Sequence, residues 1–171
     1  MRSIRFALLL CVVFSSGAAM VVAQQPAPAA PVPPLLTQAK KVFVSNAGAD
    51  SGLFPHPFSG DQDRGYGEFY AGVKALGRFD IVSDPSDADL VLELQLTAPN
   101  GPKEGDKTKG TSDPLPMFRV VIWDRRTHFV LWTLTESVDR AYLQKAHDKN
   151  FDLAIEALVK DLAKVTASSR P

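Results

Sequence analysis

The segment "LVLELQLT", residues 90–97, places the strongest constraint on the fold of this chain. Leucine occupies every second position from Leu90 to Leu96, and the positions between hold Val91, Glu93, Gln95 and Thr97. Successive side chains of a β-strand point to opposite faces of the sheet, so this alternation predicts a strand with one buried and one largely polar face. We therefore expect a sheet that is covered on one side.

The rest of the chain supplies further strands and the helices that cover the sheet. The expected elements are a strand at 40–46, an amphipathic helix within 66–79 that ends near Gly77, a short strand within 78–84, a hairpin at 117–138 with its turn at 125–128, and an amphipathic helix at 150–165 with Asn150 as N-cap. We predict an α+β fold of order β-α-β-β-β-β-α. It is a two-layer sandwich, in which a mixed sheet of about five strands carries two helices on one face.

The N-terminus has the layout of a secretory signal peptide. Arg2 and Arg5 precede an apolar run from Phe6 to Val22, and small residues stand where a signal peptidase cuts. We predict cleavage after Ala23, with retention of the run as a membrane anchor as the alternative. The predicted organisation is a signal peptide at 1–23, a proline- and alanine-rich tether at 24–39 and a single α+β domain at 40–171. A cleaved chain keeps no integral membrane segment, which predicts a periplasmic or secreted protein.

Cysteine content and charge exclude several classes of function. The only cysteine, Cys11, lies in the apolar run, so the cleaved chain has no thiol for disulfides, thiolate catalysis or metal binding. A lipoprotein is also not expected, because Leu10 is bulky and a lipid-modified cysteine is normally preceded by a small residue. Cleavage removes Arg2 and Arg5, which leaves 17 basic against 19 acidic residues. This balance offers no basic surface for nucleic acid or anionic lipid.

The stretch "SGDQDRGYGE", residues 59–68, has the composition of a cation- or phosphate-binding loop. As an EF-hand loop that starts at Asp61, it lacks the glycine at position six and the glutamate at position twelve. As a dinucleotide-binding fingerprint, it lacks the third glycine. We interpret it as a helix start, with Asp61 and Asp63 at the positive end of the helix dipole and Gly65 as a cap whose reciprocal partner is Glu68. A weak surface cation site is the alternative.

No other segment carries a complete catalytic or metal-binding motif. "GPKEGDKT", residues 101–108, imitates a phosphate-binding loop, but its spacing is one residue short and Asp106 replaces the lysine. His56, His128 and His147 share no metal-ligand spacing and are expected in exposed loops. We therefore expect no catalytic residue, no metal and no cofactor.

The hairpin is apolar on both of its faces. One face is expected to carry Phe118, Val120, Ile122, Phe129 and Leu131, and the other Val121, Trp123, Val130, Trp132 and Leu134. Two helices cover one side of a sheet, so the second apolar face needs another cover: the tether, the 98–116 loop, a second copy of the chain or a partner. We predict that the face with the two tryptophans binds a partner.

From residue 66 onward, the order of features resembles a group of bacterial envelope domains typified by the amino-terminal domain of TolB, with looser likeness to LptE-like and CsgG-like domains. The segments that carry the resemblance are "ALGRFDIV", "DADLVLELQL", "VVIWDRRTHFVLW" and "NFDLAIEALVKDLAKV". They are patterns of strand and turn without a catalytic signature. The resemblance implies a non-enzymatic periplasmic module that binds proteins or helps to organise the envelope.

These observations together predict a non-enzymatic binding or assembly module of the bacterial cell envelope. We expect it to interact through the apolar hairpin face or the 98–116 loop, with an envelope protein or a second copy of itself as partner. Two alternatives stay open, a hydrolase and a small-ligand carrier, each with a site built from the 47–63 and 98–116 loops.

Overall fold

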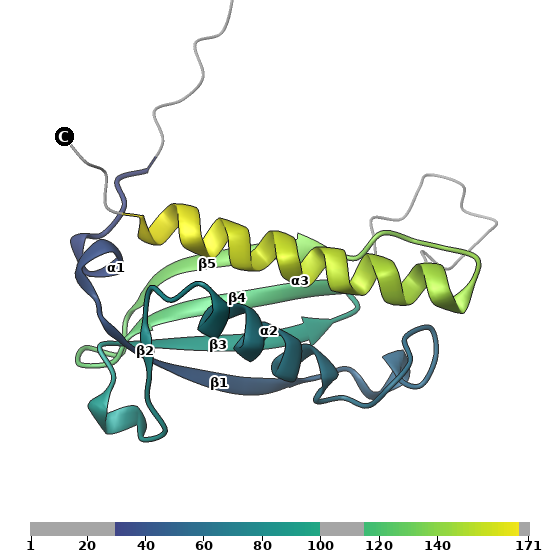
Figure 1. Cartoon of the computed structure of the whole chain (residues 1–171), viewed down its shortest axis with the longest axis horizontal. Coiled ribbons are helices and arrows are strands. Elements are labelled where there is room, and N and C mark those ends of the chain that lie inside the picture. Colours follow the sequence, from purple (N-terminus) through teal and green to yellow (C-terminus); the bar gives the residue numbers. More distant parts are fainter. Residues whose placement is uncertain (1–29, 100–114, 168–171) are drawn as a thin grey trace, which may run out of the picture. The chain divides into compact units, whose positions relative to one another are not determined.

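A five-stranded sheet is the centre of the part of the chain that the computed structural model describes, residues 30–99 and 115–167 (Figure 1). The predicted signal peptide and most of the 98–116 loop lie outside these ranges. In chain order the elements are α1 (Pro34–Gln38), β1 (Lys41–Ala49), the 3-10 turn η1 (Ser51–Leu53), α2 (Arg64–Ala75), β2 (Asp80–Ile81), the 3-10 turn η2 (Pro85–Asp87), β3 (Leu90–Thr97), β4 (Met117–Asp124), β5 (Val130–Ser137) and α3 (Gln144–Thr166).

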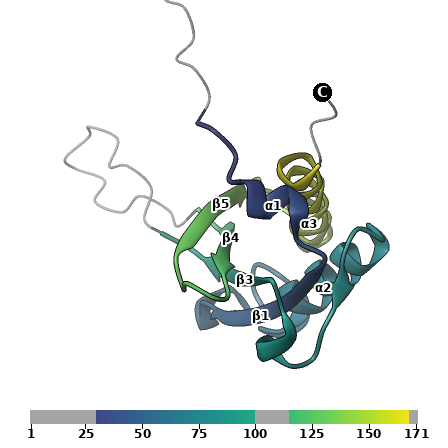
Figure 2. The same cartoon turned by 90° about the vertical axis from the view of Figure 1, so that its left-hand side faces the viewer.

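The strands lie in the order β2-β1-β3-β4-β5. β1 pairs in parallel with β2 and β3, whereas β3 with β4 and β4 with β5 are antiparallel. The parallel pairs require crossover connections, and α2 provides the crossover between β1 and β2. Both α2 and α3 lie on the same side of the sheet (Figures 1 and 2). The predicted α+β sandwich with a mixed five-stranded sheet is confirmed, and α1 is an additional short helix.

The alternation in β3 forms the centre of the core. Its leucines, Leu90 to Leu96, are at most 3% exposed, whereas the residues between them are half-buried. The same face of the sheet carries Val42 and Val44 of β1 and Phe118, Val120 and Ile122 of β4, against Phe69 and Val73 of α2 and Phe151, Ile155, Leu158 and Leu162 of α3. Each such side chain contributes about 1.5–3 kcal/mol when it is fully buried, so this layer is the main source of stability.

The acidic stretch 59–68 does start a helix, but not with the predicted cap. α2 begins at Arg64, and Asp63 before it makes no side-chain bond to a helix amide. Gly65 lies inside the first turn, where an added Cβ would come 2.9 Å from Cε1 of Phe118. Glu68 accepts a hydrogen bond from Nε of Arg64 at 2.8 Å, so its carboxylate is not the partner of a cap residue's backbone N–H. The expected cap formed by Gly65 and Glu68 is therefore wrong, because close packing on the sheet explains the glycine.

The C-terminus of α2 follows the sequence prediction. Its last helical residue is Ala75, and Gly77 has a φ of +60°. A side chain at this left-handed backbone position would be strained, so glycine is favoured just after the helix.

α3 starts at Gln144, well before the predicted N-cap Asn150. The Nδ2 group of Asn150 donates to the carbonyl of Asp139 at 3.0 Å and does not cap the helix. The first turn is held by the 47–63 loop instead, since Nε2 of Gln144 donates to the carbonyl of Pro57 at 2.8 Å. The helix therefore begins where tertiary contacts fix it, ahead of its apolar stripe.

The expected tether at 24–39 contains α1, in which Leu36 is fully buried. Arg78 joins this helix to the C-terminus of α3, because its guanidinium donates to the carbonyls of Thr37 at 2.6 Å and Thr166 at 3.1 Å. The last residues before β1 are thus part of the folded core.

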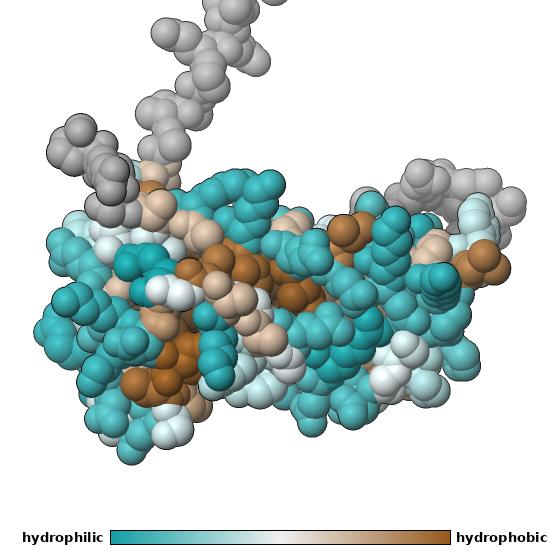
Figure 3. Space-filling model, in the orientation of Figure 1, coloured by the Kyte–Doolittle hydropathy of each residue, from teal (hydrophilic) through white to brown (hydrophobic). Residues whose placement is uncertain are grey.

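Figure 3 shows the helix-covered side, where hydrophobic residues form a band between hydrophilic ones. Tyr66 and Tyr70 of α2, Leu76 just after that helix, and Val165 of α3 are partly buried against the core. Within the described ranges, no helix combines the length and the apolar composition needed to cross a membrane.

Candidate functional site

The candidate site is the side of the sheet opposite α2 and α3, which we call the open face. Strand pairing arranges its side chains in three rows. The first row is Phe43, Val91, Trp123 and Val130, the second is Ser45, Glu93, Val121 and Thr133, and the third is Gln95, Arg119 and Thr135. The first row is apolar across four strands, and the other two are mainly polar.

The structure divides the five residues predicted to form one partner-binding face. Val121, Trp123 and Val130 lie on the open face, where Val121 itself is 6% exposed. Trp132 and Leu134 lie on the helix-covered side, because they pair with the buried residues of β4. The expectation that all five share a face is thereby corrected, since a one-residue difference in register exchanges the two faces of a strand. A partner-binding role for the open-face residues stays a prediction.

Trp123 is the largest side chain of the apolar row. It is half-buried, and its indole Nε1 has no hydrogen-bond partner within the part of the chain that the structure describes. A buried donor without an acceptor costs about 1–3 kcal/mol. The row ends in a more exposed patch, because Val130 is 49% and the adjacent Phe129 is 72% exposed.

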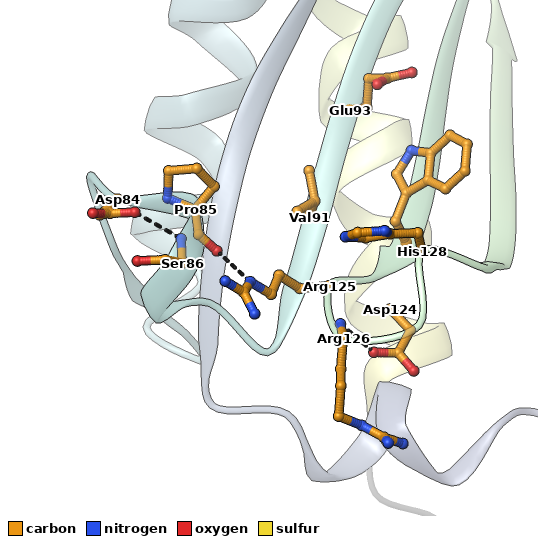
Figure 4. A pocket seen from close by; sticks show the side chains of 10 residues that line it. Asp84, Pro85, Ser86, Val91, Glu93, Asp124, Arg125, Arg126 and His128 are labelled. Carbon is orange, nitrogen blue, oxygen red and sulfur yellow. Dashed lines mark hydrogen bonds between the residues drawn. The ribbon is translucent and has the colours of Figure 1, made fainter.

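A hollow of about 620 Å³ adjoins the Trp123 end of the open face. It is lined by residues of η2, β3 and the β4–β5 turn (Figure 4). Arg125 of the turn donates through Nε to the carbonyl of Pro85 in η2 at 3.2 Å, and this bond links the two walls. Arg126 and His128 add further cationic or polar groups from the turn, and Glu93 adds a carboxylate from β3.

Asp124 organises the turn and is not a free acid. Its carboxylate accepts from Oγ1 of Thr127 at 2.7 Å and from the backbone N–H of Arg126 at 2.8 Å. The bond from Thr127, assisted by that from Arg126, lowers the pKa of Asp124 below its usual range. The turn also holds His128 at a φ of +58°. The carboxylate of Asp124 is therefore engaged in hydrogen bonds within the turn.

Glu93 and Arg119 are the charged residues of the open face. Glu93 is half-buried on β3 and Arg119 is exposed on β4. Neither makes an ion pair or a side-chain hydrogen bond with any residue of 30–99 or 115–167. Two charges without a partner in these ranges thus lie in the two rows beside the apolar row, both on the same side of it.

His56 and His147 both lie where the 47–63 loop meets α3, whereas His128 lies in the β4–β5 turn. Nδ1 of His56 lies 3.0 Å from Oε1 of Gln144, and the ring of His147 lies 6.1 Å from that of Phe58. His147 is half-buried in α3, which corrects its expected place in an exposed loop. The described ranges contain no group of three ligands that could hold a metal ion. The phosphate-loop-like segment 101–108 lies outside those ranges.

Sequence reasoning missed an ion-pair network that explains the acidic stretch. Arg64 of α2 bonds Glu68, Asp148 at 2.7 Å and Asp152 at 2.5 Å, so it joins α2 to α3. Burial disfavours the ionised form of Asp148, but bonds from the Ser59 amide and from Arg64 outweigh it and lower the pKa of Asp148 to about 2. Arg64 and Asp148 are 84 residues apart, and no local pattern signals such a pair.

The open face is suited to recognition. It offers an apolar row with an aromatic residue and two charges of opposite sign that have no ion-pair partner within residues 30–99 and 115–167, which are chemical groups that protein interfaces use; the indole Nε1 of Trp123 is buried. Asp124 and Asp84, which line opposite walls of the adjoining hollow, are held by local hydrogen bonds from the Arg126 amide and the Ser86 amide.

No family model matches this sequence, and no curated protein matches it. Similar solved structures include a DUF4136 family protein from Bacteroides thetaiotaomicron, with 12% identity, a TM-score of 0.48, and coverage of 77% of this chain and 91% of that one. They also include the PelC dodecamer from Paraburkholderia phytofirmans, with 14% identity, a TM-score of 0.41 and coverage of 77% and 91%. An uncharacterized lipoprotein B from Nitrosomonas europaea has 10% identity, a TM-score of 0.38 and coverage of 75% and 83%. The similar structures are thus bacterial and include a lipoprotein, and the resemblance to the TolB, LptE and CsgG group is not confirmed.

Proposed function

We propose that this chain is a non-enzymatic binding and assembly module of the bacterial cell envelope, with the open face as its contact surface. The apolar row of Phe43, Val91, Trp123 and Val130 carries the proposal. Neither α2 nor α3 covers it, and a partner would remove it from water. Tryptophan is among the residues that most often dominate binding energy. The signal-peptide pattern of residues 1–23 supports the envelope location.

The alternative site in the 47–63 loop has less support. Phe54 and Phe58 of this loop pack with Phe151 of α3, at ring-centroid distances of 6.2 and 4.9 Å. His56 is engaged with Gln144. The loop is therefore committed to the fold, and we do not propose a hydrolase or carrier site there.

Photo-crosslinking in living cells tests the open face. Val130 and Leu153 are both 49% exposed, the first beside Trp123 on the open face and the second on α3. A photoreactive amino acid at position 130 is expected to give a discrete crosslinked product that position 153 does not give. Trp123→Ser should reduce the product at position 130 severalfold, with Leu153→Ser as the control that leaves it unchanged. Equal products at both positions, or no effect of Trp123→Ser, would refute the proposal.

A further inference from the structure

The two charges of the open face occupy a diagonal of the sheet. Glu93 pairs with Val121, and Arg119 pairs with Gln95 in the next row, so the two charged residues lie one strand and one row apart. Diagonal neighbours on one face are separated by about 7–8 Å, which long side chains can bridge. In this chain they do not, since neither residue pairs with the other or with any residue of the described ranges.

Three other arginines of the fold bond acceptors within the described ranges. Arg64 reaches three carboxylates, Arg78 reaches two carbonyls, and Arg125 reaches the carbonyl of Pro85. The Arg126 side chain also has no printed acceptor within the described ranges, but it lies in the β4–β5 turn, whereas Arg119 lies on the open face beside the acid Glu93. The acid Glu93 and the base Arg119 of one copy are complementary to the same two residues of a second copy, provided that each acid faces the other copy's base.

A two-fold axis supplies that arrangement. The axis lies in the plane between the two facing sheets. Each residue of one copy then faces the site in the second copy that lies at the same distance on the other side of the axis. An axis through the midpoint of Glu93 and Arg119, perpendicular to the line that joins them, places each Glu93 against Arg119 of the second copy. Val121 and Gln95 then lie close to the axis, and Trp123 comes beside β5 of the second copy, between Thr133 and Thr135.

The geometry also determines how the sheets cross. Strands lie about 4.8 Å apart and two residues span about 6.7 Å, so this axis makes a steep angle with the strands. The strands of the two copies would cross at a large angle, which belongs to the orthogonal class of sheet packing. The arrangement is therefore one that protein sheets use.

We infer that the open face is a self-complementary interface between two copies of this chain, in which Glu93 of each copy pairs with Arg119 of the other. The inference rests on the proposed function, since it uses the same face and names the partner. The face spans four strands and about six residues, roughly 400 Å² of flat area per copy. A standard interface buries about 800 Å² per partner, so we expect a weak, concentration-dependent dimer with a dissociation constant in the micromolar range.

Charge reversal tests the pairing by sedimentation velocity on the exported chain, purified with its own N-terminal segment processed by the host. Glu93→Arg alone places two arginines together at each contact, and Arg119→Glu alone places two glutamates together. Each should raise the dissociation constant by about tenfold or more, because the symmetric contact occurs twice. An equimolar mixture of the two variants should dimerise like the wild type, since both contacts are then complementary. The double variant E93R/R119E should also recover dimerisation. Lys149→Glu, an exposed reversal on α3, is the control and should leave it unchanged.

Far-UV circular dichroism checks that each variant folds, and a salt series on the wild type gives a readout that needs no variant. Increasing the ionic strength from 0.05 to 0.5 M should weaken the dimer several fold, as expected for exposed charges. A monomeric wild type at millimolar concentration, or a mixture that dimerises no better than its two components, would overturn the inference. If the chain is monomeric while Trp123→Ser still reduces crosslinking at position 130, the second copy is excluded and the proposed function stands. If crosslinking also fails to depend on Trp123, both fail.

Discussion

Gly72→Ala and Gly67→Ala should change the stability of the protein in opposite directions, although both replace a glycine of α2 with alanine. A Cβ at Gly67 meets nothing within 4 Å, whereas a Cβ at Gly72 would come 2.8 Å from Cγ2 of Val159 in α3. Alanine in a helix interior is about 0.5–1 kcal/mol more favourable than glycine. Gly67→Ala is therefore expected to stabilise the fold by that amount.

At Gly72 the same gain is opposed by overpacking. Val159 is 9% exposed and β-branched, so its side chain has little freedom to rotate away. Overpacking of a core site costs about 1–3 kcal/mol, which exceeds the helix gain. We expect Gly72→Ala to lower the free energy of unfolding by roughly 0.5–2 kcal/mol, and to be about 1–3 kcal/mol less stable than Gly67→Ala.

Urea denaturation followed by circular dichroism measures both variants, and a double-mutant cycle isolates the contact. Val159→Ala removes the methyl groups that the new Cβ would meet. In that background Gly72→Ala should become stabilising, with a favourable coupling energy of about 1–3 kcal/mol. The reasoning is refuted if Gly72→Ala stabilises as much as Gly67→Ala, or if the double variant shows simple additivity.

Two further predictions concern titratable groups. The pKa of Asp148 is lowered to about 2, so its contribution to stability is present above the unfolded value near 3.8 and is lost as the pH falls through 2. At pH 7, Asp148→Asn should lower the free energy of unfolding by about 1 kcal/mol, because solvent screening of the pair with Arg64 reduces an upper limit of about 2 kcal/mol. In thermal melts, the difference in stability between this variant and the wild type should vanish near pH 2. Burial and the neighbouring Asp161 raise the pKa of Glu136, so the ionised group opposes folding at neutral pH. Glu136→Gln should therefore raise the melting temperature at pH 7, and the gain should shrink as the pH falls towards 4; a constant gain would contradict this.

The sequence predicts the elements of the sheet well because their signals are local. The alternation at 90–97 matches β3 residue for residue, and Gly77 follows the end of α2 as expected. The start of α3 was missed because residues 144–149 carry no apolar stripe, and contacts such as that of Gln144 with Pro57 hold them in the helix.

The candidate site was less accessible to sequence reasoning because it depends on register. The hairpin pairs Ile122 with Trp132 and then shifts by one residue, so that Trp123 pairs with Val130. A turn one residue longer or shorter would exchange the faces of the whole second strand, and the sequence of the turn does not determine that length. The split of the two tryptophans between opposite faces therefore required the three-dimensional structure. The Arg64 network required it too, since its partners are distant in sequence.

The order of strands in the sheet also bears on how the chain folds. A short turn joins β4 to β5, and α3 is the next element in the chain. The pairing of β1 with β3 instead joins residues far apart in the sequence, such as Val42 and Leu90. Closing long loops costs more entropy than closing short ones, and non-local pairing slows folding. The hairpin and α3 are thus expected to assemble first and to act as a template on which β1 and α2 dock later. In native-state hydrogen exchange, amides of β1 should open at a lower free energy than those of β4.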